Sequence, residues 1–225
     1  MQTIKNLLKD LLPPLLYRSL KSLKPNHPSE GKPFLGEEKS AEFYERQFIN
    51  EERWKTHYTE SGYYPLWSVL ADRLVHSGTQ SILDIGCGSG QMARLLRDKN
   101  IPHYLGFDFS STRTEYAKQT CPEFEFVFDD AFQTDLFYTY DYDTVVCTEF
   151  LEHVEKDLEV IEKIRQGTHF YATVPNYPAP AHVRVFEKVD EVIERYGKYF
   201  QSFSVIEHLV NTKGMKLYLF EGIKC

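Results

Sequence analysis

Three alternating glycines are the first residues in this sequence whose types and spacing could serve chemistry. Gly86, Gly88 and Gly90 lie in the string Asp84-Ile85-Gly86-Cys87-Gly88-Ser89-Gly90, between a β-rich run at residues 81–85 and a helical pattern that starts near Gln91. Glycines at a strand-to-helix turn let the backbone turn tightly and approach a ligand closely. The pattern therefore predicts a nucleotide-like ligand at the carboxyl end of this strand.

Two details of the glycine loop favour S-adenosylmethionine over a dinucleotide. The spacing is GxGxG, because Gly90 follows Gly88 by two residues, whereas the dinucleotide fingerprint is GxGxxG. Asp84 sits at the end of the strand, where a carboxylate could accept hydrogen bonds from a cationic amino-acid group, directly or through water. The same carboxylate would repel a pyrophosphate. The loop therefore favours a sulfonium cofactor that carries an amino acid.

Acidic residues also follow the next two predicted strands. Asp108 comes after the second strand, where it is expected to bind both ribose hydroxyls of either cofactor. Asp129 and Asp130 follow the third strand. The alternatives are a carboxylate that caps the next helix, for Asp108, and a solvated turn, for the pair. Their joint occurrence in this order favours a cofactor site.

The sequence from Tyr63 to the C-terminus resembles the class I S-adenosylmethionine-dependent methyltransferases. The four motifs of that family match, in order, residues 82–90, Asp108, residues 128–131 and residues 143–149. The resemblance implies that an acid of the third motif contacts the adenine amino group and that the fourth motif ends beside the methyl donor. The cofactor-binding residues that it implies are Asp84, Gly86, Cys87, Gly88, Gly90, Asp108, Phe109, Ser110, Asp129, Asp130, Ala131, Thr148 and Glu149.

Two segments that carry histidine are candidates for the acceptor side. The string Glu149-Phe150-Leu151-Glu152-His153 follows the fourth strand, and His182 lies in the segment after the fifth. Helical spacing would place Glu149 and His153 on one face with Glu152 beside them. A neutral histidine suits removal of a proton near pH 7, so His153 is the predicted base and His182 the second candidate. The alternative is that His153 only hydrogen-bonds a backbone group and orders the start of a helix.

The ExxEH string also resembles two metal-using branches, the ubiquinone-pathway O-methyltransferases and the RNA 3′-terminal 2′-O-methyltransferases. This resemblance implies a divalent cation, Mg²⁺ or Mn²⁺, held by Glu149, Glu152, His153 and His182. The acidic domain would repel a phosphate backbone, so nucleic acid is a disfavoured partner.

The elements that must position these residues alternate between strand and helix. This alternation predicts an α/β fold with a doubly wound, seven-stranded, mostly parallel sheet, Rossmann-like in arrangement and closed by a C-terminal antiparallel hairpin at residues 203–210 and 216–223. The carboxyl ends of its parallel strands bring the glycine loop, the acids and both histidine segments to one edge. Parallel strands are expected at residues 81–85, 103–107, 125–128, 143–147 and 169–174, and helices at residues 37–54, 63–76, 91–99, 111–120, 158–165 and 188–196.

Residues 1–36 are predicted to form an amphipathic, basic arm and linker, separate from a catalytic domain at residues 37–225. Residues 1–28 carry five basic side chains and one acidic side chain, a charge of +4. The net charge of the whole chain is −7, so the remaining residues carry −11. The arm has three alternative interpretations: a helix packed on its own domain or on a second subunit, a helix lying on an anionic membrane surface, or a disordered segment. The oligomeric state stays open.

No run of the sequence approaches about 18 consecutive apolar residues, and the N-terminus lacks a recognisable signal-peptide cleavage site. The four cysteines form no CxxC pair, which suits reduced thiols in a reducing compartment, so a cytoplasmic location is expected. Residues 1–28 could add a peripheral contact with a membrane.

O-methylation of a small-molecule or glycan hydroxyl is the leading hypothesis for the function. The basic arm has a looser likeness to methyltransferases of bacterial surface-polysaccharide assembly, which implies a glycan or a lipid-linked precursor as acceptor. The alternatives are a metal-dependent RNA 2′-O-methyltransferase and a scaffold that binds S-adenosylmethionine without turnover.

Overall fold

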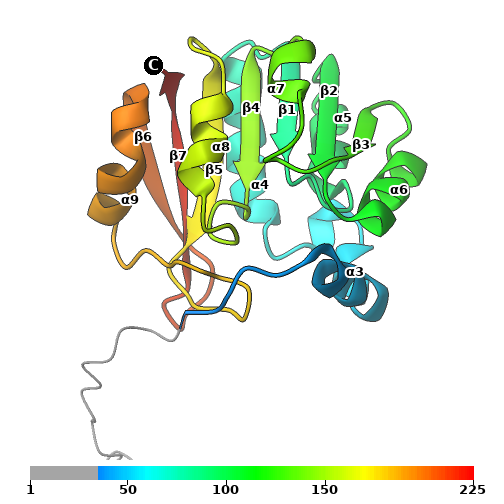
Figure 1. The fold of residues 1–225 in the computed structure, drawn as a ribbon, viewed down its shortest axis with the longest axis horizontal. Coiled ribbons are helices and arrows are strands. Elements are labelled where there is room, and N and C mark those ends of the chain that lie inside the picture. The colour runs from blue at the N-terminus through cyan, green and yellow to red at the C-terminus, as the bar shows by residue number, and fades with distance from the viewer. Residues whose placement is uncertain (1–34) are drawn as a thin grey trace, which may run out of the picture. The chain divides into compact units, whose positions relative to one another are not determined.

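The computed structural model describes residues 35–225, so the predicted arm and nearly all of its linker lie outside the described residues. The described chain is built on one seven-stranded sheet with the strand order β3-β2-β1-β4-β5-β7-β6 (Figure 1). Its strands are β1 (Ser81–Ile85), β2 (His103–Asp108), β3 (Glu125–Phe128), β4 (Thr144–Thr148), β5 (His169–Pro175), β6 (Phe200–Leu209) and β7 (Lys216–Lys224). The predicted fold class is confirmed.

Strand β1 lies at the centre of the parallel part of the sheet. It pairs with β2 on one side and with β4 on the other, so that Asp84 stands opposite Gly106 and Val146. Both faces of a parallel sheet are covered, which is why β1 is apolar on both sides, and Ile82 and Leu83 are completely buried. Asp84 is therefore a carboxylate placed within a hydrophobic strand, next to the glycine loop.

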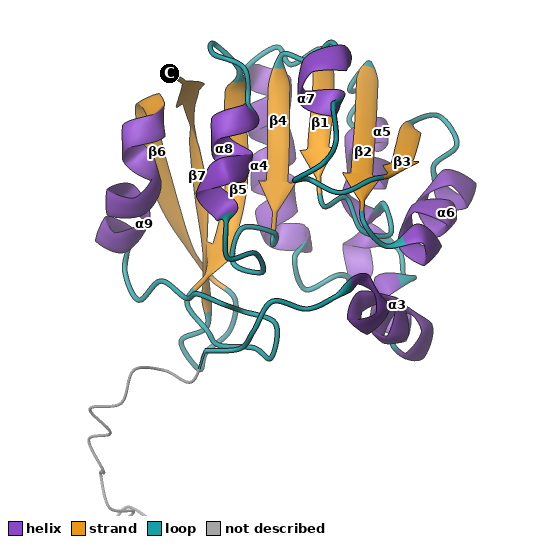
Figure 2. Cartoon of the chain, viewed as in Figure 1, coloured by secondary structure: helices purple, strands orange, loops and turns teal. Residues whose placement is uncertain are grey.

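Helices cover both faces of the sheet (Figure 2). Helices α4 (Tyr64–His76), α5 (Gln91–Asp98) and α6 (Ser111–Thr120) contribute to one hydrophobic core, and α7 (Leu136–Thr139), α8 (Asp157–Lys163) and α9 (Val189–Tyr196) contribute to the other. The short helix α7 was not predicted. The predicted helix at residues 37–54 is shorter in the structure: α3 spans Ala41–Asn50, and the 3₁₀ turn η1 follows at Glu52–Trp54.

The C-terminal hairpin is antiparallel, as predicted, and β7 inserts between β5 and β6. Strand β6 begins at Phe200, three residues earlier than expected from the sequence. The extra residues pair with β7 across a register irregularity between Gln201 and Ser204, where Ser202 adopts a φ of 53°. Alternating polarity cannot reveal a strand across such an irregularity, because the inward and outward positions exchange there.

Residues 35–60 lie along the edge where the parallel strands end, with α3 below β2 and β3 in Figure 1. The segment is tied down at both ends of this edge. The Gly36 amide donates to the carbonyl of His182 (2.8 Å), and the Ser89 hydroxyl donates to the carbonyl of Trp54 (2.5 Å). No helix among residues 35–225 is long and apolar enough to cross a membrane.

Candidate active site

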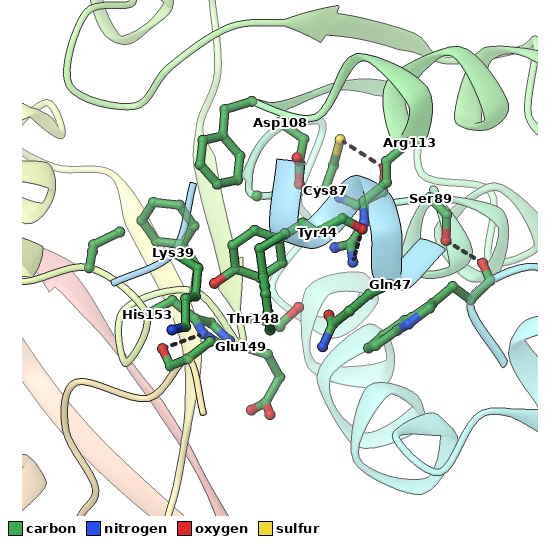
Figure 3. A pocket seen from close by; sticks show the side chains of 18 of the residues that line it. Lys39, Tyr44, Gln47, Cys87, Ser89, Asp108, Arg113, Thr148, Glu149 and His153 are labelled. Atoms are coloured by element: carbon green, nitrogen blue, oxygen red, sulfur yellow. Dashed lines mark hydrogen bonds between the residues drawn. The ribbon is translucent and has the colours of Figure 1, made fainter. Parts of the chain in front are cut away.

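A cavity of about 410 Å³ lies at the carboxyl edge of the sheet (Figure 3). Its walls come from the glycine loop after β1, the end of β2, the loop after β3, the end of β4, the segment after β5, and α3. Eleven of the predicted cofactor residues line it: Asp84, Gly86, Cys87, Gly88, Asp108, Phe109, Asp129, Asp130, Ala131, Thr148 and Glu149. Gly90 and Ser110 are not among the lining residues.

Asp84 is a buried carboxyl group that faces this cavity. The Tyr104 hydroxyl donates to its Oδ2 atom at 2.5 Å, whereas its Oδ1 atom has no hydrogen-bond partner among the described residues. Burial raises the pKa of Asp84 to about 7, the Tyr104 hydroxyl opposes this rise, and the nearby Asp108 adds to it. An unpartnered buried oxygen is costly unless a ligand satisfies it, so Asp84 is suited to accept a hydrogen bond from a cationic group.

The loop needs glycine at different positions for different structural reasons. Gly86, Gly88 and Gly90 all have positive φ angles, of 74°, 55° and 76°. A Cβ atom on Gly90 would lie 2.9 Å from that of Ala117 in α6, so this glycine permits close helix packing and does not face the cavity. A Cβ atom on Gly88 would meet no atom within 4 Å, because this residue borders the cavity. Gly88 is thus the glycine that lets the backbone approach a ligand.

Asp108 ends β2 with both carboxylate oxygens held by backbone amides. Its Oδ2 accepts from the Gly88 amide (3.0 Å) and its Oδ1 from the Ser110 amide (2.8 Å). The N-cap of α6 is Ser110, so Asp108 does not cap that helix as the alternative interpretation proposed, and each of its oxygens keeps a further lone pair for a ligand. Burial raises the pKa of Asp108, and Arg113 and the two amides oppose the rise. The contact with Gly88 joins this acid to the glycine loop.

Asp129 and Asp130 form a tight turn after β3. The Oδ1 of Asp129 accepts from the Asp130 amide (2.8 Å), and the Oδ1 of Asp130 accepts from the Phe132 amide (2.7 Å). The Lys163 side chain donates to the carbonyl of Ala131 at 2.9 Å and so fixes the end of this turn. Both residues thus form a turn, as in the alternative interpretation, but the turn is half-buried and lines the cavity.

Arg113 is a cavity residue that we did not predict from the sequence. Its guanidinium lies 5.3 Å from the ring centre of Tyr44 and 5.2 Å from that of Trp54, and its Nε atom is buried without a partner among the described residues. Burial lowers the pKa of Arg113, and the charge of Asp108 opposes this effect. The available signal was its position five residues after Asp108, on the helix that starts at the same edge. Tyr44 and Trp54 could not be assigned, since only the fold brings residues 35–60 over the loop.

The segment after β4 is not helical, which corrects the predicted placement of the acceptor residues. Residues 149–156 form turns, and α8 starts only at Asp157. Glu149 adopts a φ of 53°, which is rare for a residue with a side chain. It makes two hydrogen bonds with Thr173: the Glu149 amide donates to Oγ1 of Thr173 (2.9 Å), and this hydroxyl donates to Oε1 of Glu149 (3.0 Å). Burial raises the pKa of Glu149 to about 7.

Glu152, His153 and His182 converge beside the cavity, and their ligating atoms lie within 4.8 Å of one another. Both carboxylate oxygens of Glu152 are buried without a hydrogen-bond partner among the described residues. The Nδ1 atom of His153 lies 3.0 Å from the carbonyl oxygen of Ala181. The Nδ1 atom of His182 lies 2.9 Å from the carbonyl oxygen of Tyr177. Because a carbonyl only accepts, Nδ1 carries the proton on each ring and Nε2 keeps its lone pair.

The charge states of this cluster follow from its burial. Burial raises the pKa of Glu152, and the carboxyl group of Glu149 adds to the rise. Burial lowers the pKa of His153 to about 3, and it also lowers that of His182. Both imidazoles are therefore neutral at physiological pH. Of the four residues implied as metal ligands, the structure groups three, and Glu149 lies outside the group because its turn directs it to Thr173.

Three solved structures share this fold. The methyltransferase domain of a bacterial Hen1 protein, CtHen1-C, is 18% identical, with a TM-score of 0.55 over 71% of this chain and 97% of that domain. The N-methyltransferase NodS of Bradyrhizobium japonicum WM9, in complex with S-adenosylhomocysteine, is 16% identical, with a TM-score of 0.62 over 81% and 97%. Magnesium protoporphyrin IX methyltransferase of Synechocystis PCC 6803, with bound S-adenosylhomocysteine, is 16% identical, with a TM-score of 0.59 over 83% and 100%. At these identities the likeness concerns the fold alone.

The fold is that of the Rossmann-like methyltransferases. The sequence model of the methyltransferase domain family matches residues 40–214, and the chain belongs to that family. No curated protein sequence matches the chain. Because the similar folds include an N-methyltransferase, the acceptor has to be inferred from this chain's own residues.

Proposed function

We propose that this protein transfers the methyl group of S-adenosylmethionine to a hydroxyl of a small-molecule or glycan acceptor. The observation that carries this proposal is the pair of neutral imidazoles at His153 and His182, which lie with the buried carboxyl group of Glu152 beside the cavity. Methyl transfer from a sulfonium needs little activation of the donor, whereas a hydroxyl acceptor must lose its proton. Two neutral imidazoles whose Nε2 atoms keep a lone pair suit that requirement.

In this proposal the glycine-loop end of the cavity holds the cofactor. The free Oδ1 of Asp84 would accept from the cationic amino group, and the remaining lone pairs of Asp108 would accept from the ribose hydroxyls. The methyl group would then lie near Thr148 and Glu149, where the cavity continues toward His153. A hydroxyl bound there would give its proton to Nε2 of His153, the atom that lies 3.7 Å from Oε1 of Glu152.

The same three side chains also fit a divalent cation. Glu152 offers an unpartnered buried carboxylate, and each histidine is held through Nδ1 by a carbonyl, the usual outer support of a metal-binding imidazole. Two imidazoles favour Mn²⁺ over Mg²⁺, which prefers oxygen ligands. We propose Glu152, His153 and His182 as its ligands, without Glu149. When bound, the cation would lower the pKa of the acceptor hydroxyl.

The acceptor class is tested by transfer of a labelled methyl group. Protein and labelled S-adenosylmethionine are incubated with fractions of a cell extract, and the products are separated and identified by mass spectrometry. We expect a methyl ether in a small-molecule or glycan fraction. Label on an amine would overturn the proposal, and label only on RNA, lost with a chelator, would support the RNA alternative.

The cation is tested by direct binding. Electron paramagnetic resonance of Mn²⁺ added to the full chain should show bound ion, and the substitution Glu152→Gln should weaken this binding, because it removes the one carboxylate of the group. Binding that is lost with Glu149→Gln but kept with Glu152→Gln would contradict the assigned ligands.

The arm at residues 1–28 is proposed to contact an anionic membrane surface, which would bring the domain near a lipid-linked acceptor. Its charge of +4 and its amphipathic pattern support this proposal. Removal of residues 1–28 should reduce co-sedimentation with phosphatidylserine vesicles and leave affinity for S-adenosylhomocysteine unchanged. Equal co-sedimentation of both chains would overturn it.

A further inference from the structure

We infer that Arg184 is a positioning residue: it holds the loop that carries Glu152 and His153 against the segment that carries His182. This inference rests on the proposed function, because it concerns the geometry of that same site. The two segments come from different strands, since the loop follows β4 and the His182 segment follows β5. Some contact between them must therefore set the arrangement of the three side chains.

The guanidinium of Arg184 binds the loop through its backbone. Its Nη1 donates to the carbonyls of Leu151 and Val154, and its Nη2 donates to the carbonyl of Glu155 at 2.9 Å. The carbonyl of Glu152, which follows Leu151 in the loop, accepts from the Val183 amide at 2.8 Å. Four carbonyls of a non-helical loop are thus satisfied by two consecutive residues of the other segment.

A buried carboxylate holds Arg184 in turn. Asp157, at the start of α8, is fully buried, and its Oδ1 lies 3.3 Å from Nη2 of Arg184. The same carboxylate accepts from Arg195 at 2.6 and 2.8 Å and from the Tyr196 hydroxyl at 2.8 Å. Asp157 therefore orients the guanidinium, whose Nη1 and Nη2 atoms bind the loop carbonyls.

The spacing within the sequence explains the effect on the site. Arg184 stands two residues after His182, and the carbonyls that it binds flank Glu152 and His153 on both sides. The hydrogen bond from His153 Nδ1 to the carbonyl of Ala181 crosses between the same two segments. If the segments separate, this bond is lost and the ring of His153 is free to turn. The arginine thus acts on the proposed base through the loop and does not line the cavity.

The experiment compares Arg184→Gln with Arg195→Gln. Both variants remove a cation from Asp157, but Arg195 binds no carbonyl of the loop, so it is the matched control for stability. The readout is the ring nitrogen spectrum of ¹⁵N-histidine in the full chain with S-adenosylhomocysteine, with His153→Gln identifying the His153 signals. We expect His153 to have its proton on Nδ1 in the native chain and in Arg195→Gln, and to shift toward the Nε2-protonated form in Arg184→Gln.

An unchanged His153 spectrum in Arg184→Gln, with a loss of melting temperature like that of Arg195→Gln, would show a purely structural role and overturn the inference. If Arg184→Gln does not fold, Arg184→Lys provides the test, because lysine keeps the charge beside Asp157 but cannot reach all three carbonyls. A partial shift of the His153 signals is expected in that variant, and an unshifted spectrum would count against the inference. This readout needs no acceptor, so it is independent of whether the methyl group goes to a hydroxyl.

Discussion

The Nε2 atom of His153 lies 3.7 Å from the Oε1 atom of Glu152. This distance is longer than a hydrogen bond, and neither carboxylate oxygen of Glu152 has another partner among the described residues. Burying a carboxyl group in this way is costly unless a ligand, proton or cation completes the arrangement. The proximity of these two groups therefore marks the acceptor end of the cavity.

Substitution of either group should impair methyl transfer and spare cofactor binding. We expect Glu152→Gln and His153→Gln each to lower the transfer rate by about 10²–10⁴-fold, the usual contribution of a positioned acid or base. Affinity for S-adenosylhomocysteine, measured by calorimetry, should not change, because the proposed cofactor contacts lie at the other end of the cavity. Glu155→Gln, which alters an exposed acid of the same loop, is the control. Loss of cofactor affinity in His153→Gln would place this histidine in the cofactor site.

Cofactor affinity should depend on pH through Asp84. Because burial raises its pKa to about 7, Asp84 gains a proton as the pH falls below 7 and then no longer attracts a cationic group. Binding of S-adenosylhomocysteine should therefore weaken between pH 7.5 and pH 5.5, as followed by calorimetry. For stability the sign is opposite: between pH 3.8 and about 7 the carboxyl is ionised in the unfolded chain but still protonated in the folded one, so the free energy of unfolding falls as the pH rises through this range.

Two variants check the role of Asp84. Asp84→Asn should bind S-adenosylhomocysteine more weakly and should lose most of the pH dependence between pH 5.5 and pH 7.5. Tyr104→Phe removes the hydroxyl that favours the ionised carboxyl, so the midpoint should move to higher pH. A pH profile that Asp84→Asn leaves intact would assign the titration to another group.

Gly88 and Gly90 should separate binding from stability. Alanine at Gly90 combines a strained left-handed backbone with a contact of 2.9 Å to Ala117, so we expect a loss of roughly 2–4 kcal/mol in the free energy of unfolding. Alanine at Gly88 meets no atom of the protein, so the strain alone should cost about 1–2 kcal/mol. Its methyl group borders the cavity, and affinity for S-adenosylhomocysteine should fall roughly tenfold, about 1.4 kcal/mol. Denaturant unfolding and calorimetry measure the two effects, and a reversed pattern would contradict this division.

The parts of the fold and site that the sequence predicts are those set by neighbours along the chain. Strand β1, the glycine loop and Asp108 follow from local pattern, because a buried parallel strand is apolar on both faces and its acid lies at its carboxyl end. The hairpin of β6 and β7 is predicted for the same reason, apart from the first residues of β6. The order of these signals is sufficient to predict a methyltransferase fold.

The remainder depends on contacts that no local pattern encodes. Glu149 is predicted on a helix, but its positive φ is not helical, and its side chain bonds Thr173 outside the histidine cluster. Gly90 matches the cofactor motif, yet its reason for being glycine is the neighbouring helix α6. The placement of Tyr44 against Arg113 depends on the path of residues 35–60 across the sheet edge, which the spacing within α3 does not fix.

Arg113 should contribute to cofactor affinity, because its guanidinium lines the cavity and its charge opposes the rise in the pKa of Asp108. Arg113→Met keeps a long side chain between the rings of Tyr44 and Trp54 but removes the charge. We expect affinity for S-adenosylhomocysteine to fall by about tenfold, about 1.4 kcal/mol, measured by calorimetry at pH 7.5. The free energy of unfolding should change less than the free energy of binding, since the variant also removes the cost of burying a cation.

The control is Arg165→Met. The guanidinium of Arg165 stacks at 4.0 Å on the ring of Tyr142, away from the cavity. Equal affinity in both variants would show that Arg113 only packs residues 35–60 onto α6, whereas a loss confined to Arg113→Met would make it part of the cofactor site.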